Sequence, residues 1–267
     1  MIVVFTAVHG AFETAQHTIA AIDRSCPAPY MHLIGDDFSP EPDHSHYMSL
    51  PSIPHPQCLR AVYECSELGS DGGPSMGLSL GYVWSFARVL RAEALWVVES
   101  DVVPQQDIVA FFRQAPEFYG DGPIGAIAPL YTGGGSALTT YGGKDLVEVQ
   151  DFPERLGIAP GDNIVKSDTL AHTVARVTWA HLACLWIPLS TLDDERIFPD
   201  PNFGLWFLDH DLSNQLDRNG LHMIVSNKCV ADHPRAAAST GVRWPDGAIR
   251  TEAEVAGRCQ LYGKWGR

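Results

Sequence analysis

The sequence predicts an α/β fold with a mostly parallel central sheet, and two observations carry the prediction. Short apolar runs rich in β-branched residues recur through residues 1–130, and such runs are typical of strands that are buried on both faces. Between them, apolar residues stand three and four positions apart, which is the spacing of one helix face. Strands that alternate with helices in this way form a parallel sheet through right-handed crossovers.

The first elements follow from the amino terminus onward. Residues 3–7 form an apolar strand, and the spacing of apolar residues over 12–22 predicts a helix. Pro27 and Pro29 end that helix because proline has no backbone N–H to donate. A second strand over 31–34 then leads into an acidic turn.

Irregular and regular segments alternate through the middle of the chain. Residues 39–58 are rich in proline and histidine and predict a surface excursion, and residues 67–77 predict a Gly/Ser/Asp loop. The elements expected after that loop are a helix over 80–90, a strand over 95–98, a helix over 108–115 and a strand over 124–128.

The second half of the chain has weaker periodicity and opens with a glycine- and threonine-rich stretch over 131–143. The elements expected beyond it are strands over 173–179, 184–187 and 222–225, a helix over 205–216 and a short final helix. Gly220 can end the longer helix, and Thr251 and Glu254 have capping-box spacing before the final one. We find no internal repeat and no clear linker, which predicts one domain.

Composition and charge exclude several classes of protein. The 267 residues are 45% hydrophobic, and 18 Lys and Arg against 32 Asp and Glu give a net charge of −14. Such a composition is globular and excludes global disorder. The acidity speaks against a nonspecific binder of nucleic acid or anionic membranes, because phosphate contact needs clustered cations. A phosphorylated substrate stays compatible, since a bound divalent cation can supply the positive charge locally.

The six cysteines and the apolar runs indicate the compartment. No two cysteines stand at CxxC spacing, which excludes zinc-ribbon and thioredoxin motifs. The first residues lack the basic segment of a secretory signal, and no apolar run approaches the ~20 residues of a membrane span. We therefore expect reduced thiols in a cytoplasmic protein without a membrane segment.

Acidic side chains gather where ligands bind in this class of fold. They are Asp36 and Asp37 after the second strand, Glu99 and Asp101 after the third, and Asp209 and Asp211 at the helix near Leu212. Ligands of open α/β sheets bind beyond the carboxyl ends of the strands. Each carboxylate alone is as compatible with a turn or a helix cap, but their coincidence favours one shared site.

The ordered motifs resemble those of a GT-A glycosyltransferase and are closest in pattern to the inverting family two. They are Asp-Asp-Phe-Ser at 36–39, Glu-Ser-Asp at 99–101, Leu-Asp-His-Asp-Leu at 208–212 and His233-Pro234, with a final Lys-Trp-Gly at 264–266. The family has Asp-Asp-Gly-Ser, Asp-x-Asp, Glu-Asp-x-Asp-Leu and a later His in the same order. The resemblance covers about residues 2–235.

The resemblance implies a fold, a domain plan and an activity. One GT-A domain over 1–267 would comprise a nucleotide-sugar-binding half at about 1–130, an acceptor and catalytic half at about 131–235, and a C-terminal lid or helix at about 236–267. It would move a sugar from a nucleoside-diphosphate-sugar such as a UDP-sugar to an acceptor hydroxyl, with inversion. The acceptor stays open between a glycan, a small molecule and, disfavoured by the acidity, modified DNA.

A divalent cation, Mn²⁺ or Mg²⁺, belongs to the activity that the resemblance implies. Asp101 and His233 would hold it, because carboxylates suit hard cations and imidazole suits Mn²⁺ better than Mg²⁺. The cation would stabilise the departing nucleoside diphosphate. Glu99 occupies the first position of the Asp-x-Asp pattern and reaches one methylene further than Asp. Without the resemblance, His233 is equally compatible with a loop histidine.

The resemblance also assigns a base and the donor contacts. Asp209 would take the proton of the acceptor hydroxyl, although Leu208 replaces the usual Glu before it. Asp211 lies about 200° further round the helix and is expected to support the helix instead. The expected donor contacts are Asp36 or Asp37 to the nucleoside, Thr6 and His9 lining the cleft, and Glu99 and Asp101 at the Asp-x-Asp position. A C-terminal lid could fold over the diphosphate through Arg235, Arg243, Trp244 and Lys264.

Two rival functions remain. A sugar-nucleotide nucleotidyltransferase would share the sheet and the metal, but it would need a cationic glycine-rich loop after the first strand, where this chain has Ala-Val-His-Gly-Ala-Phe at 7–12. A non-catalytic nucleotide- or sugar-binding module would accommodate Glu99 and Leu208 in place of the usual residues. Turnover of a donor with Mn²⁺ separates the enzyme from the module.

Overall fold

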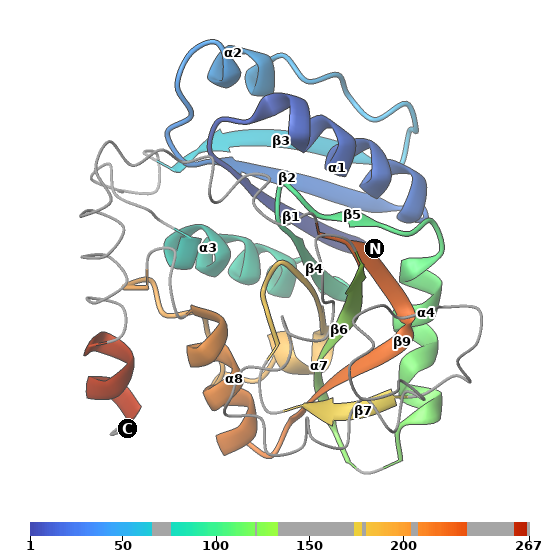
Figure 1. The fold of residues 1–267 in the computed structure, drawn as a ribbon, viewed down its shortest axis with the longest axis vertical. Coiled ribbons are helices and arrows are strands. Elements are labelled where there is room, and N and C mark those ends of the chain that lie inside the picture. The colour runs from blue at the N-terminus through green and yellow to red at the C-terminus, as the bar shows by residue number, and fades with distance from the viewer. Residues whose placement is uncertain are drawn as a thin grey trace.

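A nine-stranded sheet forms the centre of the molecule (Figure 1). The computed structural model describes residues 1–65, 76–120, 122–132, 174–177, 180–203, 208–233 and 259–265. The strands are β1 (Ile2–Val8), β2 (Tyr30–Asp36), β3 (Leu59–Glu64), β4 (Ala94–Val98), β5 (Val103–Pro104), β6 (Ile124–Thr132), β7 (Val174–Val177), β8 (Cys184–Pro188) and β9 (His222–Asp232). Their order is β3-β2-β1-β4-β8-β6-β9-β5, and β7 also pairs with β9.

Six of these strands run in one direction, as the alternation of strand and helix predicts. β1, β2, β3 and β4 pair in parallel, and β6 pairs in parallel with β9. β8 lies between β4 and β6 and runs antiparallel to both, while β5 and β7 run antiparallel to β9. The carboxyl ends of the six codirectional strands therefore share one edge with the beginning of β8.

Helices cover this sheet (Figure 1). They are α1 (Phe12–Ser25), α2 (Asp43–Met48), α3 (Met76–Val89), α4 (Ile108–Gln114), the 3₁₀ turn η2 (Ala115–Phe118), α7 (Leu189–Leu192) and α8 (Leu208–Arg218), and residues 259–265 are also helical. α3 packs on β1 and β4, whereas α4 and α8 pack on β9. None of the described helices combines the length and the apolar character that crossing a membrane requires.

The predicted elements are largely confirmed, and the differences have physical reasons. β1 and β4 are buried almost throughout, as their apolar runs predict. Gly220 adopts φ +70° after α8, the left-handed conformation that ends many helices. The excursion over 39–58 instead contains α2, a short polar helix that buries only Tyr47. β3 is an edge strand whose half-exposed residues give no apolar run. Thr251 and Glu254 lie outside the described residues.

Candidate metal and catalytic site

Glu99, Asp101 and His233 form one cluster at the carboxyl edge of the sheet. One ligand atom from each lies within 4.8 Å of the others, and His233 Nε2 is 3.6 Å from Asp101 Oδ1. The ring of Tyr131, from β6, stands edge-on to the His233 ring at 5.3 Å. The structure thus brings Asp101 and His233 together, as the sequence predicts for two ligands of one cation, and adds Glu99.

Strand pairing explains why residues more than a hundred positions apart meet here. The chain leaves β4, turns through a hydrogen bond from Val102 N to Glu99 O (3.2 Å), and enters β5. β5 pairs antiparallel with the end of β9, where Val103 stands opposite Asp232. This register places Asp101 beside His233, the residue that follows β9.

Helix α1 fastens the segment that carries Asp101. The hydroxyl of Thr18 donates to Ser100 O at 2.9 Å, and the hydroxyl of Ser25 donates to Gln105 O at 3.1 Å. Gln105 in turn donates through Nε2 to Lys228 O of β9 at 2.7 Å. Thr18 of α1 therefore holds the turn between β4 and β5, and the bonds of Gln105 tie the residue after β5 to α1 and to β9.

The electrostatics of the cluster favour a bound cation. Burial raises the pKa of Glu99, and the neighbouring Asp101 carboxylate raises it further against the opposing effect of His181. Burial alone would lower the pKa of His233, but the nearby Asp101 carboxylate prevails and raises that pKa. Two carboxylates held this close repel each other unless a positive charge lies between them. Two carboxylates and one imidazole, with no thiolate, fit a hard or borderline cation such as Mn²⁺.

Asp209 lies in the first turn of α8, with 14% of its side chain exposed. Its Oδ1 accepts hydrogen bonds from the backbone N–H and the ring Nδ1 of His210, at 2.8 and 2.9 Å. Burial acts to raise the pKa of Asp209, but the hydrogen bonds from His210 outweigh it, with a contribution from the nearby His181 ring, and lower that pKa. Asp209 is therefore ionised at neutral pH, as a general base must be.

His181 is a member of this site that the sequence analysis does not include. Its Nδ1 is 4.0 Å from Glu99 Oε1, and its ring centre is 6.1 Å from that of His233. The Ala183 N–H donates to Nδ1 at 3.1 Å, which leaves the ring proton on Nε2. The imidazole also influences the pKa of Asp209. His181 thus lies beside the cluster and also in the surroundings of the candidate base.

The loop after β2 carries two acidic residues with different surroundings. Asp36 is buried, and its carboxylate accepts from Ser39 N at 2.9 Å and pairs with His44 Nδ1 at 2.7 Å. The hydrogen bond to Asp36 raises the pKa of His44. Asp37 is partly exposed. Asp36 therefore holds the loop together, and Asp37 is the more accessible of the two for a ligand.

Hydrogen bonds join this loop to the one that follows β1. Asp37 N donates to Val8 O at 2.8 Å, Gly10 N donates to the hydroxyl of Ser39 at 2.8 Å, and the His9 ring contacts Asp37 O. His9 therefore lies exposed at the carboxyl edge, where a cleft residue was expected.

The expectation for Thr6 needs correction. Thr6 does not follow the first strand but lies inside β1, fully buried. Its hydroxyl pairs with His32 Nε2 at 3.0 Å. The side chain is therefore part of the core between β1 and β2 and does not line a cleft.

Known proteins match this chain in structure but not in sequence. No protein-family model and no curated protein sequence matches the chain. The fold matches that of GalNAc-T7, crystallised with UDP, GalNAc and Mn²⁺, at 13% identity and a TM-score of 0.57, over 88% of this chain and 43% of that one. It also matches S. aureus TarS in complex with UDP-GlcNAc at 11% identity and a TM-score of 0.55, over 88% and 58%.

A third match is the mannosyltransferase PcManGT from Pyrobaculum calidifontis, in complex with GDP-Man and Mn²⁺. It is 14% identical with a TM-score of 0.50, over 86% of this chain and 56% of that one. This chain has a GT-A glycosyltransferase fold. It spans about half the length of the proteins whose structures it matches.

Within this GT-A fold, Lys264 makes contacts that its sequence motif does not reveal. Its Nζ lies 2.9 Å from Asp200 Oδ2 and 2.8 Å from the buried carboxylate of Asp211. The indole Nε1 of Trp265 donates to the same Asp211 carboxylate at 2.8 Å. Lys264 was expected over the diphosphate, and here it is paired with two carboxylates of the protein. Arg243, Arg235 and Trp244 lie outside the described residues.

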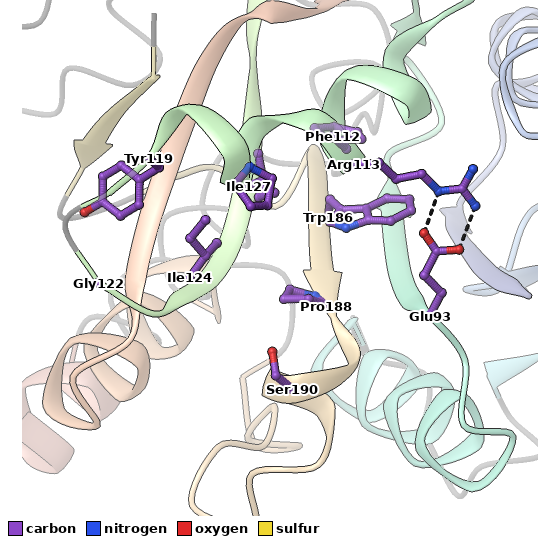
Figure 2. A pocket seen from close by; sticks show the side chains of 11 residues that line it. Glu93, Phe112, Arg113, Tyr119, Gly122, Ile124, Ile127, Trp186, Pro188 and Ser190 are labelled. Carbon is purple, nitrogen blue, oxygen red and sulfur yellow. Dashed lines mark hydrogen bonds and ion pairs between the residues drawn. The ribbon is translucent and has the colours of Figure 1, made fainter.

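A pocket of about 450 Å³ lies beside the strands β6 and β8 and the helix α4 (Figure 2). Glu93, just before β4, and Pro188, at the end of the antiparallel β8, both line it. Arg113 makes two hydrogen bonds to the Glu93 carboxylate, at 2.5 and 2.6 Å, and Phe112 stacks on Trp186. The pocket has an apolar wall and lies at the amino end of β4, whereas the Glu99, Asp101 and His233 cluster lies at the carboxyl ends of the parallel strands.

Proposed function

We propose that this chain is a metal-dependent glycosyltransferase that moves a sugar from a nucleoside-diphosphate-sugar to an acceptor hydroxyl, with inversion. The observation that carries the proposal is the cluster of Glu99, Asp101 and His233 at the carboxyl edge of a GT-A sheet. Asp209 and His181 lie close enough to influence the pKa of Glu99. The structures it matches were crystallised with UDP, UDP-GlcNAc or GDP-Man, and two of them with Mn²⁺.

Asp101, His233 and Glu99 would hold the cation, Mn²⁺ or Mg²⁺. When bound, the cation supplies positive charge to the diphosphate as the glycosidic bond breaks. The protein contributes three metal ligands that folding has already positioned. The β5–β9 pairing and the hydrogen bonds from α1 fix this arrangement. Residues that are positioned in advance lose little further entropy when they act.

Asp209 would act as the general base. The oxygen of the acceptor hydroxyl forms a bond to the anomeric carbon while the bond from that carbon to the phosphate oxygen breaks. The electron pair of the broken bond leaves with the nucleoside diphosphate, and the hydroxyl proton passes to Asp209. Its lowered pKa keeps the carboxylate ionised, which is the form that can accept a proton. Inversion follows if the base faces the side opposite the leaving group.

The nucleoside would lie along the loop after β2. Asp37 is the partly exposed member of the acidic pair and His9 lies beside it, and both would contact the ribose or the base. The donor would occupy the half at about 1–130 and the acceptor the half at about 131–235. None of the six cysteines forms a disulfide among the described residues, and the compartment proposed for the chain is a reducing one, the cytoplasm.

Two variants test the proposal in binding and in turnover. Asp101→Asn removes a charged ligand and should abolish the Mn²⁺-dependent binding of UDP or GDP, measured by isothermal titration calorimetry. Asp209→Asn should bind these nucleotides as the wild type does. Its release of nucleoside diphosphate from a nucleotide-sugar should fall by about 10²- to 10⁴-fold, the usual contribution of a general base.

The matched control is Asp107→Asn, which changes an exposed carboxylate six residues beyond Asp101. It should bind and turn over like the wild type. The proposal is wrong if Asp101→Asn and Asp209→Asn both release nucleoside diphosphate at the wild-type rate. A wild-type chain that binds nucleotides with Mn²⁺ but never turns over a donor would instead indicate a binding module.

A further inference from the structure

Phe38 has a backbone conformation that its side chain does not favour. Its φ is +58°, in the left-handed region, where a bulky residue is an outlier and glycine is at ease. The resembling family has glycine at this position. Burial does not account for the aromatic ring either, because 41% of the residue is exposed. Strain of this kind tends to persist at functional sites.

The backbone on both sides of Phe38 is held in place. Asp37 N bonds to Val8 O at 2.8 Å, and Ser39 N bonds to Asp36 Oδ1 at 2.9 Å. The hydroxyl of Ser39 also accepts from Gly10 N at 2.8 Å. Neither neighbour can move without breaking these bonds. The ring is therefore attached to a fixed support, which lowers the entropy that a ligand contact would lose.

The position of this loop relative to the metal cluster suits a nucleoside diphosphate. β1 lies between β2 and β4 in the sheet, so two strand spacings, about 10 Å, separate the ends of β2 and β4. A nucleotide whose phosphates lie at the cluster after β4 can extend along the carboxyl edge toward β2. Its base then arrives at the loop that carries Asp37 and Phe38.

We propose that the ring of Phe38 is the surface on which the nucleobase of the donor stacks, and that this contact keeps an aromatic residue at a position suited to glycine. The inference rests on the proposed function, since it assumes a nucleoside diphosphate at the cluster. A planar aromatic ring offers any base a stacking face. Selection between bases then falls to the hydrogen-bonding groups beside it, of which Asp37 is one.

Calorimetric titration with UDP, GDP and pyrophosphate, each with Mn²⁺, tests this inference. Phe38→Asn tolerates the left-handed conformation but removes the ring. It should weaken UDP and GDP binding by about 5- to 100-fold, the effect expected for loss of one base-stacking contact. Pyrophosphate has no base, so its affinity should stay as in the wild type. Phe38→Tyr keeps the ring and should bind both nucleotides within about twofold of the wild type.

The stability of Phe38→Gly gives an independent readout. Glycine relieves the strained φ, so its Tm should equal or exceed that of the wild type, by up to about 4 °C, while nucleotide binding falls. If Phe38 had only a structural role, Phe38→Gly would have a lower Tm than the wild type. Nucleotide affinity that Phe38→Asn leaves unchanged would overturn this inference alone. Failure of the wild type to bind any nucleoside diphosphate with Mn²⁺ would overturn the proposed function as well.

Discussion

His32 is a titratable side chain in the core, between β2 and its neighbours. It is fully buried, and burial, aided by the Arg60 guanidinium, lowers its pKa to about 3. Its Nε2 pairs with the Thr6 hydroxyl, whereas its Nδ1 has no hydrogen-bond partner among the described residues. The imidazole in the folded chain therefore stays neutral down to about pH 3.

This neutral histidine should make the protein sensitive to acid. The unfolded chain binds the proton near pH 6.5 and the folded chain only near pH 3, so stability is lost as the pH falls through this window. His32 alone contributes a slope of up to about 1.4 kcal/mol per pH unit. Urea unfolding at pH 7.5, 6 and 5 measures it. His32→Gln should flatten the profile, and His17→Gln, at an exposed position of α1, should not. An unchanged slope in His32→Gln would contradict this account.

The sequence predicts part of the candidate site residue by residue. Asp101 and His233 could be predicted as neighbours because each follows a strand of an ordered motif series. His181 could not, because it comes before β8. The start of an antiparallel strand lies at the same side of the sheet as the ends of the parallel strands. The apolar run of β8 does not reveal that β8 is antiparallel, so the sequence cannot predict that His181 lies near Glu99. The contacts of Asp211 and Lys264 also depend on tertiary packing that no local spacing encodes.

At the scale of elements, the sequence predicts what is buried and periodic. β1, β4 and α1 are recognisable because their apolar residues follow the period of the element. α2 and β3 are not, because α2 is six mostly polar residues and β3 lies at the sheet edge. Such elements form because neighbours hold them, as His44 of α2 is held by Asp36.

The helical residues 259–265 are joined to α8 by a buried polar contact. Asp211 is fully buried and is contacted by Gln215 Nε2 at 2.7 Å, by Lys264 Nζ and by the Trp265 indole. The Arg218 guanidinium lies over the Trp265 ring at 4.2 Å. Asp211 stands two residues after the candidate base, so the same turn of α8 carries both the base and this attachment.

Removing one charge of the Asp211–Lys264 pair should destabilise the chain. Lys264→Met leaves the buried carboxylate without its cation and should cost about 1–2 kcal/mol of unfolding free energy, a modest value because a third of the Lys264 side chain is exposed. Adding Asp211→Asn should cost less than the sum of the two single changes. Urea unfolding of all four chains completes this double-mutant cycle. Tyr262→Phe, at an exposed position of the same helix, is the control. Strict additivity would show that the pair contributes nothing.

At the scale of the whole molecule, one core serves both halves of the sequence. The main hydrophobic cluster extends from Ile2 in β1 to Leu261 near the carboxyl terminus. β8, from the second half of the sequence, lies between β4 and β6, which come from the first. Neither half therefore has a complete sheet of its own, although each holds a different part of the proposed reaction.

We expect the chain to unfold in a single cooperative transition. Separating the halves would expose the backbone edges of β4 and β6 and the shared core, so an isolated half should not be stable. Differential scanning calorimetry should give equal calorimetric and van't Hoff enthalpies. Tryptophan fluorescence should share its midpoint with far-UV circular dichroism. Two separate transitions would show that the halves are independent domains.

The bond from Thr18 to the turn after β4 has a consequence for amide hydrogen exchange. Glu99 N–H bonds to Ala183 O and Val102 N–H bonds to Glu99 O, and the turn that carries them is tied to α1. The Glu99 amide can meet solvent only when the turn separates from Ala183, and the Thr18 bond to Ser100 opposes that separation, so this amide should exchange as slowly as the core strands do. The residues that would hold a cation thus keep their arrangement in the metal-free state, so a cation binds to a site that is already formed.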